Sequence, residues 1–438
     1  LIASVMNNKG RAAARSGLGA VMGSKKLKAV AVQGSLQVPV DKPDVMRKLR
    51  KTHATSLTGG AGPLHEIGTP GIYDVCCKID DAPTKNWTGV AEIDSPNYEE
   101  CRGANVIAKQ KRRYGCWRCP IACGGIMKAG TGEYVYEEGA HKPEYETMAM
   151  FGSNLCNDNL ESLIVLSDIC NRLGVDTISA GACIAFTIEC FENGIITTEE
   201  TGGLEMRWGD HRNIVAMTEM LCKREGFGDV IADGVKTAAE RIGKGAERYA
   251  MHIGGQEFAA HDPRGGWGFA IAYGADPTPG RHNQGQNPHP PGIVDEELER
   301  TARSGRGPNH KRLTNYFHAA NALGLCHFVI GSYPHADQLI EALKAITGWE
   351  DLTTEELIKT GERITNVRQA FNIREGLATP FKYPDRMRGV PPKTVGPRAG
   401  ITFTQEEILN QYLEEMDWDT TTGKPSKTKL LELGLDDI

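Results

Sequence analysis

The sequence has no apolar run as long as the roughly 18 residues that a membrane-spanning helix requires, and no signal-peptide pattern opens it. It also lacks an excess of positive charge, because 50 lysine and arginine residues face 56 aspartate and glutamate residues, for a net charge of −6. We therefore expect neither membrane insertion nor binding to nucleic acid. The mean hydropathy of −0.38 and 12 cysteines without a secreted disulfide pattern predict a soluble, cytoplasmic protein.

Two common phosphate-binding fingerprints are also absent. The glycines between Gly17 and Gly23 are spaced G-x-G-x-x-x-G, one residue too long for the dinucleotide fingerprint, and the following residues do not form a Walker loop. The same segment nevertheless carries Arg11 and Arg15, and glycine lets backbone amides approach an anion closely. Either a phosphate cradle of another kind or an ordinary loop leading into a strand at 27–32 would explain this composition.

Three cysteines with C-x2-C-x3-C spacing, Cys116, Cys119 and Cys123, are the most informative motif that is present. One tight loop can direct three thiolates at a single centre, and an iron–sulfur cluster takes four thiolates. Zinc also fits C-x2-C, but its other two ligands usually form a second close pair, and the sequence contains no such pair. Three buried structural cysteines are the remaining interpretation. A cluster requires a fourth cysteine from a distant part of the chain.

Most of the chain has the apolar periodicity of helices. The long connections between these segments are rich in glycine and carry the polar residues. The pattern therefore predicts a mainly α-helical protein. The predicted helices span residues 45–57, 160–173, 177–192, 213–225, 231–242, 296–302, 311–323, 336–346, 354–373 and 405–415.

A short pattern, Asn-x-Leu-Gly-x-(Asp/Cys), occurs twice, from Asn171 to Asp176 and from Asn321 to Cys326. Each copy ends a predicted helix with a glycine that can adopt the left-handed cap conformation. The two copies predict either two similar corners that face one site, or a coincidence between two ordinary helix ends. The second copy supplies Cys326, which we predict to be the fourth cysteine of the cluster.

Taken together, these motifs resemble the tungsten-dependent aldehyde:ferredoxin oxidoreductase family along essentially the whole chain. The resemblance rests on the Arg11–Lys25 run, the cysteine loop, Pro-Glu-Tyr-Glu-Thr at 143–147, Gly-Gln-Glu-Phe at 255–258, His-Asp-Pro-Arg-Gly at 261–265 and Leu-Gly-Leu-Cys at 323–326. It implies two helical domains and a short remnant of an N-terminal β-rich domain, with boundaries at 1–38, 39–245 and 246–438. Because the chain begins at Leu1 without a methionine, we expect it to be the later part of a longer protein.

The resemblance also assigns cofactor-binding residues. It implies one [4Fe–4S] cluster on Cys116, Cys119, Cys123 and Cys326, beside a bis-pterin that carries tungsten or molybdenum. Asn171 and Asn321 open the two copies of the repeated pattern, where the family has an acidic residue that binds the pterin ring. An asparagine could still accept a hydrogen bond from the pterin but would bring no negative charge. A magnesium ion would bridge the pterin phosphates. The implied pterin and phosphate residues are Arg11, Arg15, Gly17, Gly19, Asn171, Gly174, Asp176, Asn321, Gly324 and Leu325.

For catalysis, Tyr145 and Glu146 match the adjacent pair that lines the substrate pocket of the family. A buried glutamate is a suitable general base, because burial can raise its pKa toward neutral pH. His282, in a loop rich in Pro and Gly, is the first candidate for a hydrogen-bond donor, and His261 is the second. The alternatives are that Glu146 only caps its helix and that His282 is a solvated loop residue.

The resemblance implies oxidation of an aldehyde to a carboxylic acid, with electrons leaving singly through the cluster. Because no second cluster motif or nicotinamide fingerprint is present, the electrons require a partner, either ferredoxin or an iron–sulfur or flavin subunit. The family also allows a homodimer. Two alternatives stay open: the tungsten subunit of a class II benzoyl-CoA reductase-like complex, and a cluster-bearing electron-transfer subunit without tungsten.

Overall fold

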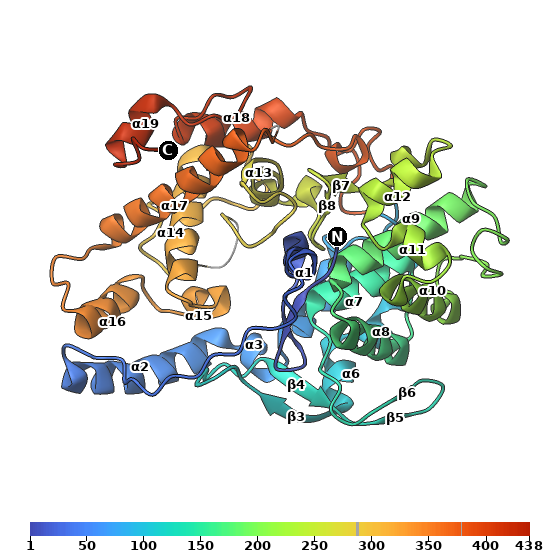
Figure 1. The fold of residues 1–438 in the computed structure, drawn as a ribbon, viewed down its shortest axis with the longest axis horizontal. Coiled ribbons are helices and arrows are strands. Elements are labelled where there is room, and N and C mark those ends of the chain that lie inside the picture. The colour runs from blue at the N-terminus through green and yellow to red at the C-terminus, as the bar shows by residue number, and fades with distance from the viewer. Residues whose placement is uncertain (286–288, 378) are drawn as a thin grey trace.

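Helices dominate the computed structural model, which describes residues 1–285, 289–377 and 379–438 (Figure 1). The prediction of a mainly α-helical fold is confirmed. Strands form only small two-stranded antiparallel sheets in the described residues. No helix among these residues combines the length and the apolar character that a membrane crossing would require. The predicted domain boundaries stay a prediction.

One group of helices surrounds the almost fully buried helix α9 (Thr177–Glu192). The preceding helix α8 (Leu160–Leu173) begins at the Asn159 side chain, which accepts the backbone N–H of Ser162 at 2.9 Å. The Asp176 side chain caps α9 in the same way, so the bounds predicted for both helices are confirmed. The rest of this group comprises α7 (Tyr145–Phe151), α10 (His211–Lys223), α11 (Phe227–Ile231) and α12 (Val235–Ile242).

A second group of helices lies on the opposite side of the molecule (Figure 1). Its smaller hydrophobic cluster joins α14, α16 and α17, whereas α13 and α18 belong to the large core shared with the first group. The helix α2 (Pro43–Ala61) packs against α16. The second group comprises α13 (Trp267–Ala275), α14 (Arg306–Ala322), α15 (His327–Gly331), α16 (Asp337–Thr347), α17 (Thr354–Arg374), α18 (Gln405–Glu415) and α19 (Lys427–Glu432).

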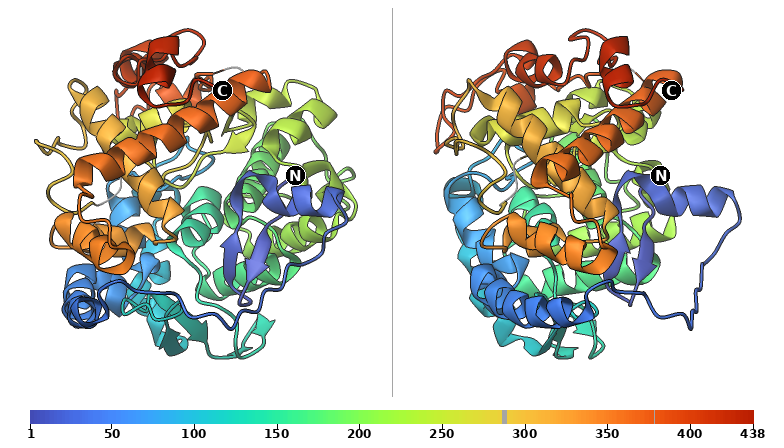
Figure 2. Two further views of the ribbon diagram at one scale, coloured as in Figure 1. Left: turned by 60° about the vertical axis from the view of Figure 1, so that its left-hand side comes forward. Right: turned by 90° about the vertical axis from the view of Figure 1, so that its left-hand side faces the viewer.

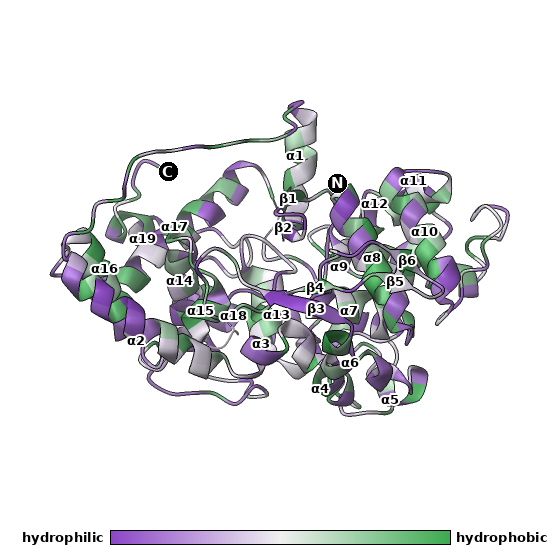
Figure 3. Ribbon diagram, turned by 90° about the horizontal axis from the view of Figure 1, so that it is seen from below, coloured by the Kyte–Doolittle hydropathy of each residue, from purple (hydrophilic) through white to green (hydrophobic). Residues whose placement is uncertain are grey.

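The N-terminal segment forms a hairpin of β1 (Val5–Asn7) and β2 (Arg11–Ala13), followed by α1 (Leu18–Ser24). Helix α1 stands out from the body of the protein, and a long irregular segment returns from it to α2 (Figures 2 and 3). The strand predicted at 27–32 is wrong, because this stretch has no strand to pair with and Val32 is 95 % exposed.

Short elements connect these groups. The hairpin of β3 (Gln110–Tyr114) and β4 (Gly124–Met127) carries the cysteine motif in its loop. The others are α3 (Pro63–Glu66), α4 (Tyr73–Lys78), α5 (Ala91–Asp94), α6 (Gly103–Ala108), β5 (Gly130–Thr131), β6 (Val135–Tyr136), β7 (His252–Ile253) and β8 (Gln256–Glu257). The helix predicted at 296–302 is wrong: the Glu296 carbonyl, which would accept the N–H of residue 300 in a helix, accepts a hydrogen bond from the Asn309 side chain instead.

The closest approach between α14 and α17 depends on Gly361. A Cβ atom at this position would lie 1.7 Å from the backbone oxygen of Asn315. We expect Gly361→Ala to lower the free energy of unfolding by roughly 1–3 kcal/mol, because the two helices must move apart. Urea unfolding followed by circular dichroism measures the change. Gly59→Ala is the matched control, because its Cβ meets nothing within 4 Å in α2, and equal stability of the two variants would contradict the prediction.

Candidate cofactor cavity and active site

A cavity of about 480 Å³ lies where the N-terminal hairpin, α7, the corner between α8 and α9, and the loop after α13 meet. Six predicted site residues from four parts of the chain contribute to its lining: Arg11, Arg15, Glu146, Asn171, Asp176 and His282. The fold therefore gathers six of the thirteen residues predicted for the pterin and the chemistry around one space.

Three arginines line this cavity beside the carboxylates of Glu144, Glu146 and Asp176. Within the described residues, Arg11 Nε and Nη2, Arg15 Nε and Nη1, and Arg281 Nε are buried and have no hydrogen-bond partner. Burial lowers the pKa of Arg281, and the neighbouring Arg15 lowers it further. Buried cationic N–H groups are costly unless an anion accepts their hydrogen bonds. The donor set therefore fits a ligand with phosphate groups, and the volume is that of a typical cofactor site.

Glu144, which the sequence reasoning missed, orients Arg11. Its Oε1 accepts a hydrogen bond from Arg11 Nη1 at 2.7 Å, and its Oε2 binds the hydroxyl of Thr69. The Arg11 guanidinium also lies over the ring of Tyr114, 5.2 Å from the centroid. Because Tyr114 is the last residue before the cysteine loop, Arg11 connects that loop with the cavity.

The two copies of the repeated pattern share their local geometry but not their surroundings. Gly174 and Gly324 both take left-handed conformations, with φ of 70° and 74°, and Asp176 and Cys326 each occupy the N-cap of the next helix. Only the first copy lines the cavity. Asn321 and Gly324 lie exposed at the end of α14, with Leu325 half-buried after them.

Gly17 and Gly19 lie outside the cavity lining. Gly17 lines a second cavity of about 640 Å³ between α1 and α12. Gly19 packs against the backbone of Ala3, whose oxygen accepts its N–H at 3.0 Å. Gly19 therefore fits α1 against the N-terminal strand.

The three cysteines of the motif and Cys326 come together from two distant parts of the chain. Burial raises the pKa of Cys326, and the nearby Cys119 and Cys116 raise it further. Burial likewise raises the pKa of Cys123 to about 11, with a contribution from Cys326. No three of these thiols, all in described residues, lie within 4.8 Å of one another, whereas sulfur atoms around one zinc ion would be about 3.8 Å apart.

Glu146 has one carboxylate oxygen fixed and one free. Its Oε2 accepts the backbone N–H of Ala260 at 2.8 Å. Its Oε1 lies 3.2 Å from His282 Nε2 and 3.8 Å from His261 Nε2, without hydrogen-bond geometry to either ring. Since its partner Ala260 is far from α7 in sequence, Glu146 does not cap its helix. Burial raises the pKa of this carboxyl, which makes it a better proton acceptor near neutral pH.

His282 is not a solvated loop residue, because its side chain is only 20 % exposed. Burial lowers the pKa of His282 well below its usual range, and the positive charges of His261, His327 and Arg15 act in the same direction. The ring is therefore neutral at neutral pH and can donate one N–H. Tyr145 lies behind the site: its hydroxyl donates to the oxygen of Ala260 at 2.6 Å, and its ring stacks on His261.

Asp81, which sequence reasoning also missed, binds His261 Nδ1 through its Oδ2 at 2.7 Å. The two residues are 180 positions apart, so no sequence pattern could have paired them. Arg281, by contrast, immediately precedes His282 and could have been found from that position.

Comparison with known proteins identifies the family. The model for aldehyde ferredoxin oxidoreductase domains 2 and 3 matches residues 44–435, and the model for the N-terminal domain of the same enzymes matches residues 1–34. The chain therefore belongs to the aldehyde ferredoxin oxidoreductase family, a family of oxidoreductases.

Individual relatives agree with this assignment. The chain is 36 % identical to the tungsten-containing aldehyde ferredoxin oxidoreductase of Pyrococcus furiosus, over 99 % of this chain and 71 % of that protein. It is 29 % identical to the WOR-like subunit of the aliphatic sulfonate oxidoreductase of the same organism, over 99 % and 68 %. Its fold matches a chain of the active-site complex BamBC of benzoyl coenzyme A reductase with a TM-score of 0.78, at 22 % identity, over 100 % of this chain and 71 % of that one.

Proposed function

We propose that this chain oxidises an aldehyde to a carboxylic acid with a tungsten bis-pterin in the cavity, and passes the electrons singly through a [4Fe–4S] cluster to ferredoxin. The observation that carries the proposal is the free Glu146 Oε1, which faces His282 in a cavity where three arginines each have at least one buried N–H group without a partner. The tungsten-containing relatives from Pyrococcus furiosus and Pyrococcus abyssi, 36 % and 34 % identical, support the same chemistry.

The residues of the cavity would hold the cofactor by charge and hydrogen bonding. Arg11, Arg15 and Arg281 would bind its phosphates, with a bridging magnesium ion, and Asn171 and Asp176 would bind the pterin ring. The four cysteines Cys116, Cys119, Cys123 and Cys326 would bind the cluster. When bound, the tungsten group accepts two electrons and the cluster passes them on one at a time.

The reaction converts an aldehyde and water into a carboxylic acid, two protons and two electrons. Glu146 accepts one of these protons at Oε1, while the Ala260 N–H keeps the carboxylate in place. The neutral His282 donates a ring N–H to the substrate oxygen. The buried ring of Tyr145 and the ring of His261, which is 12 % exposed, stack behind Glu146 and limit the access of water there.

Metal analysis of the anaerobically purified chain, followed by activity assays, tests the proposal. We expect about four iron atoms and about one tungsten atom per chain, with aldehyde oxidation coupled to ferredoxin or a viologen dye. Molybdenum in place of tungsten would change the metal but not the proposed reaction. Iron without tungsten would indicate an electron-transfer subunit, and zinc alone would contradict the redox function. Activity on aryl-CoA substrates without aldehyde oxidation would indicate a reductase.

A further inference from the structure

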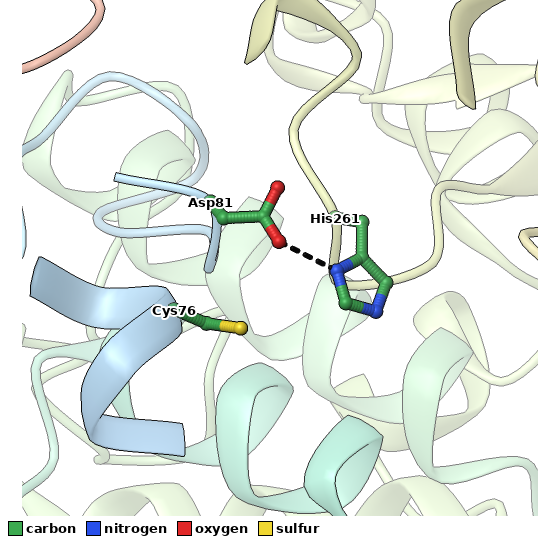
Figure 4. Close-up of side chains that lie close together, drawn as sticks. All are labelled: Cys76, Asp81 and His261. Atoms are coloured by element: carbon green, nitrogen blue, oxygen red, sulfur yellow. Dashed lines mark hydrogen bonds and ion pairs between the residues drawn. The ribbon is translucent and has the colours of Figure 1, made fainter. Parts of the chain in front are cut away.

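Behind Glu146, a second buried carboxylate reaches the same site through a histidine. Asp81, which follows α4, is 1 % exposed, and its Oδ2 lies 2.7 Å from His261 Nδ1 (Figure 4). The opposite ring nitrogen, Nε2, lies 3.8 Å from Glu146 Oε1. The imidazole therefore lies between two carboxylates, hydrogen-bonded to the one behind the cavity and facing the one at it.

The ring of His261 is held in one orientation. It stacks between Tyr145 and Phe269, with centroid distances of 5.0 and 4.8 Å and interplanar angles of 30° and 13°. Stacking on both faces opposes rotation of the ring, and the bond to Asp81 fixes which edge faces Glu146. Asp81 itself is held by Arg300 and by the backbone N–H of Asp262.

We propose that Asp81 is a positioning residue for Glu146: it holds His261 Nδ1–H so that a protonated imidazole faces the free Glu146 oxygen and keeps that carboxyl ionised between turnovers. This inference rests on the proposed role of Glu146 as proton acceptor. Asp81 is not among the residues that line the cavity and acts only through His261.

The charges around the three groups agree with this role. Burial opposes a charge on His261, but Asp81 and then Glu146 raise its pKa above the usual value, against a smaller opposing effect of Arg300. Burial raises the pKa of Glu146, and His261 is the strongest group that lowers it, followed by the Ala260 N–H and Arg15. Asp176 acts in the opposite direction. Loss of the positive charge on His261 should therefore leave Glu146 more easily protonated.

Cys76 also faces Asp81 and His261, and the three side chains have the composition of a metal site (Figure 4). One feature argues for a proton-holding pair instead: the Arg300 guanidinium already neutralises Asp81.

The experiment compares Asp81→Asn with Asp80→Asn. Asp80 is an equally buried neighbouring carboxylate, but it pairs with Lys393 at 2.8 Å, away from His261. In cofactor-free protein, the His261 pKa is measured by NMR of labelled histidine, and the His261 signal is assigned by its absence in His261→Gln. The Glu146 pKa is measured from its infrared carboxyl band, which is assigned by its absence in Glu146→Gln. We expect Asp81→Asn to lower the His261 pKa by roughly 1–3 units and to raise the Glu146 pKa, with Asp80→Asn changing neither.

In the loaded enzyme, Asp81→Asn should move the acid limb of the kcat profile to higher pH while KM changes little. His261→Gln, which keeps Asp81, should raise the Glu146 pKa in the same way, so the inference stays testable if Asp81→Asn does not fold. An unchanged Glu146 pKa in both variants, or an equal shift in Asp80→Asn, would overturn it. Because the two pKa readouts need no activity, their result is distinct from failure of the proposed oxidation.

Discussion

Glu146→Gln is expected to reduce the kcat for aldehyde oxidation by roughly 10²–10⁴-fold, the usual contribution of a positioned general base. The replacement has the same shape, and its amide oxygen can still accept the Ala260 N–H, so the loop that carries His261 should keep its position. What is lost is the free oxygen that takes the proton beside His282. Steady-state kinetics, with tungsten and iron counted in the same preparation, measure the effect.

The control for this variant is Glu161→Gln. Glu161 lies on α8 and pairs with Lys109 at 2.8 Å outside the cavity, so its loss should leave kcat within about twofold, as expected for a substitution away from special features. If Glu146→Gln retained most of the activity with a full metal complement, Glu146 would not be the base.

The pH dependence of the wild-type enzyme follows from the same residue. A base must be ionised to accept a proton, so activity should fall as the pH falls through the Glu146 pKa. Because burial raises that pKa above the ordinary value of 4.5, the acid limb should lie above 4.5. His282 contributes no limb near neutral pH, since its pKa is lowered well below its usual range.

Local sequence chemistry accounts for the elements that were predicted correctly. The bounds of α8 and α9 follow from two side-chain caps and from Gly174, all of which act within a few residues. The strand at 27–32 and the helix at 296–302 depended on groups outside each segment: the first has no partner strand, and in the second the Glu296 carbonyl accepts a hydrogen bond from Asn309 instead of a helical N–H. Such competition between local pattern and tertiary contact cannot be read from one segment.

The same distinction applies to the site. Glu146, His282 and the cysteines carry recognisable motifs, whereas Asp81 lies in a stretch with no chemical pattern and gains its role from a contact with His261, 180 residues away. The placement of Asn321 and Gly324 away from the cavity was equally hidden, because both copies of the pattern have the same local geometry. A sequence motif therefore indicates the local geometry of a helix end, but it does not indicate whether that end lies at the cavity.

Cys326→Ala is expected to lower the iron content from about four atoms per chain to well below one, and to abolish electron transfer to ferredoxin. Three thiols from one hairpin loop cannot complete a cluster that needs four, and the structure brings Cys326 to Cys116, Cys119 and Cys123 from the N-cap of α15. Iron analysis and the visible absorbance of the anaerobic protein measure the loss.

Cys222→Ala provides the control, because this half-buried cysteine lies on α10, away from the loop. The tungsten content distinguishes the pterin site from the cluster. The residues that would hold the pterin are the arginines and Asp176, and Cys326 is not one of them, so tungsten should remain when iron is lost. Full iron in Cys326→Ala would place the fourth ligand elsewhere. Loss of both metals would mean that the cluster, through the Arg11 connection between its loop and the cavity, is required to hold the pterin.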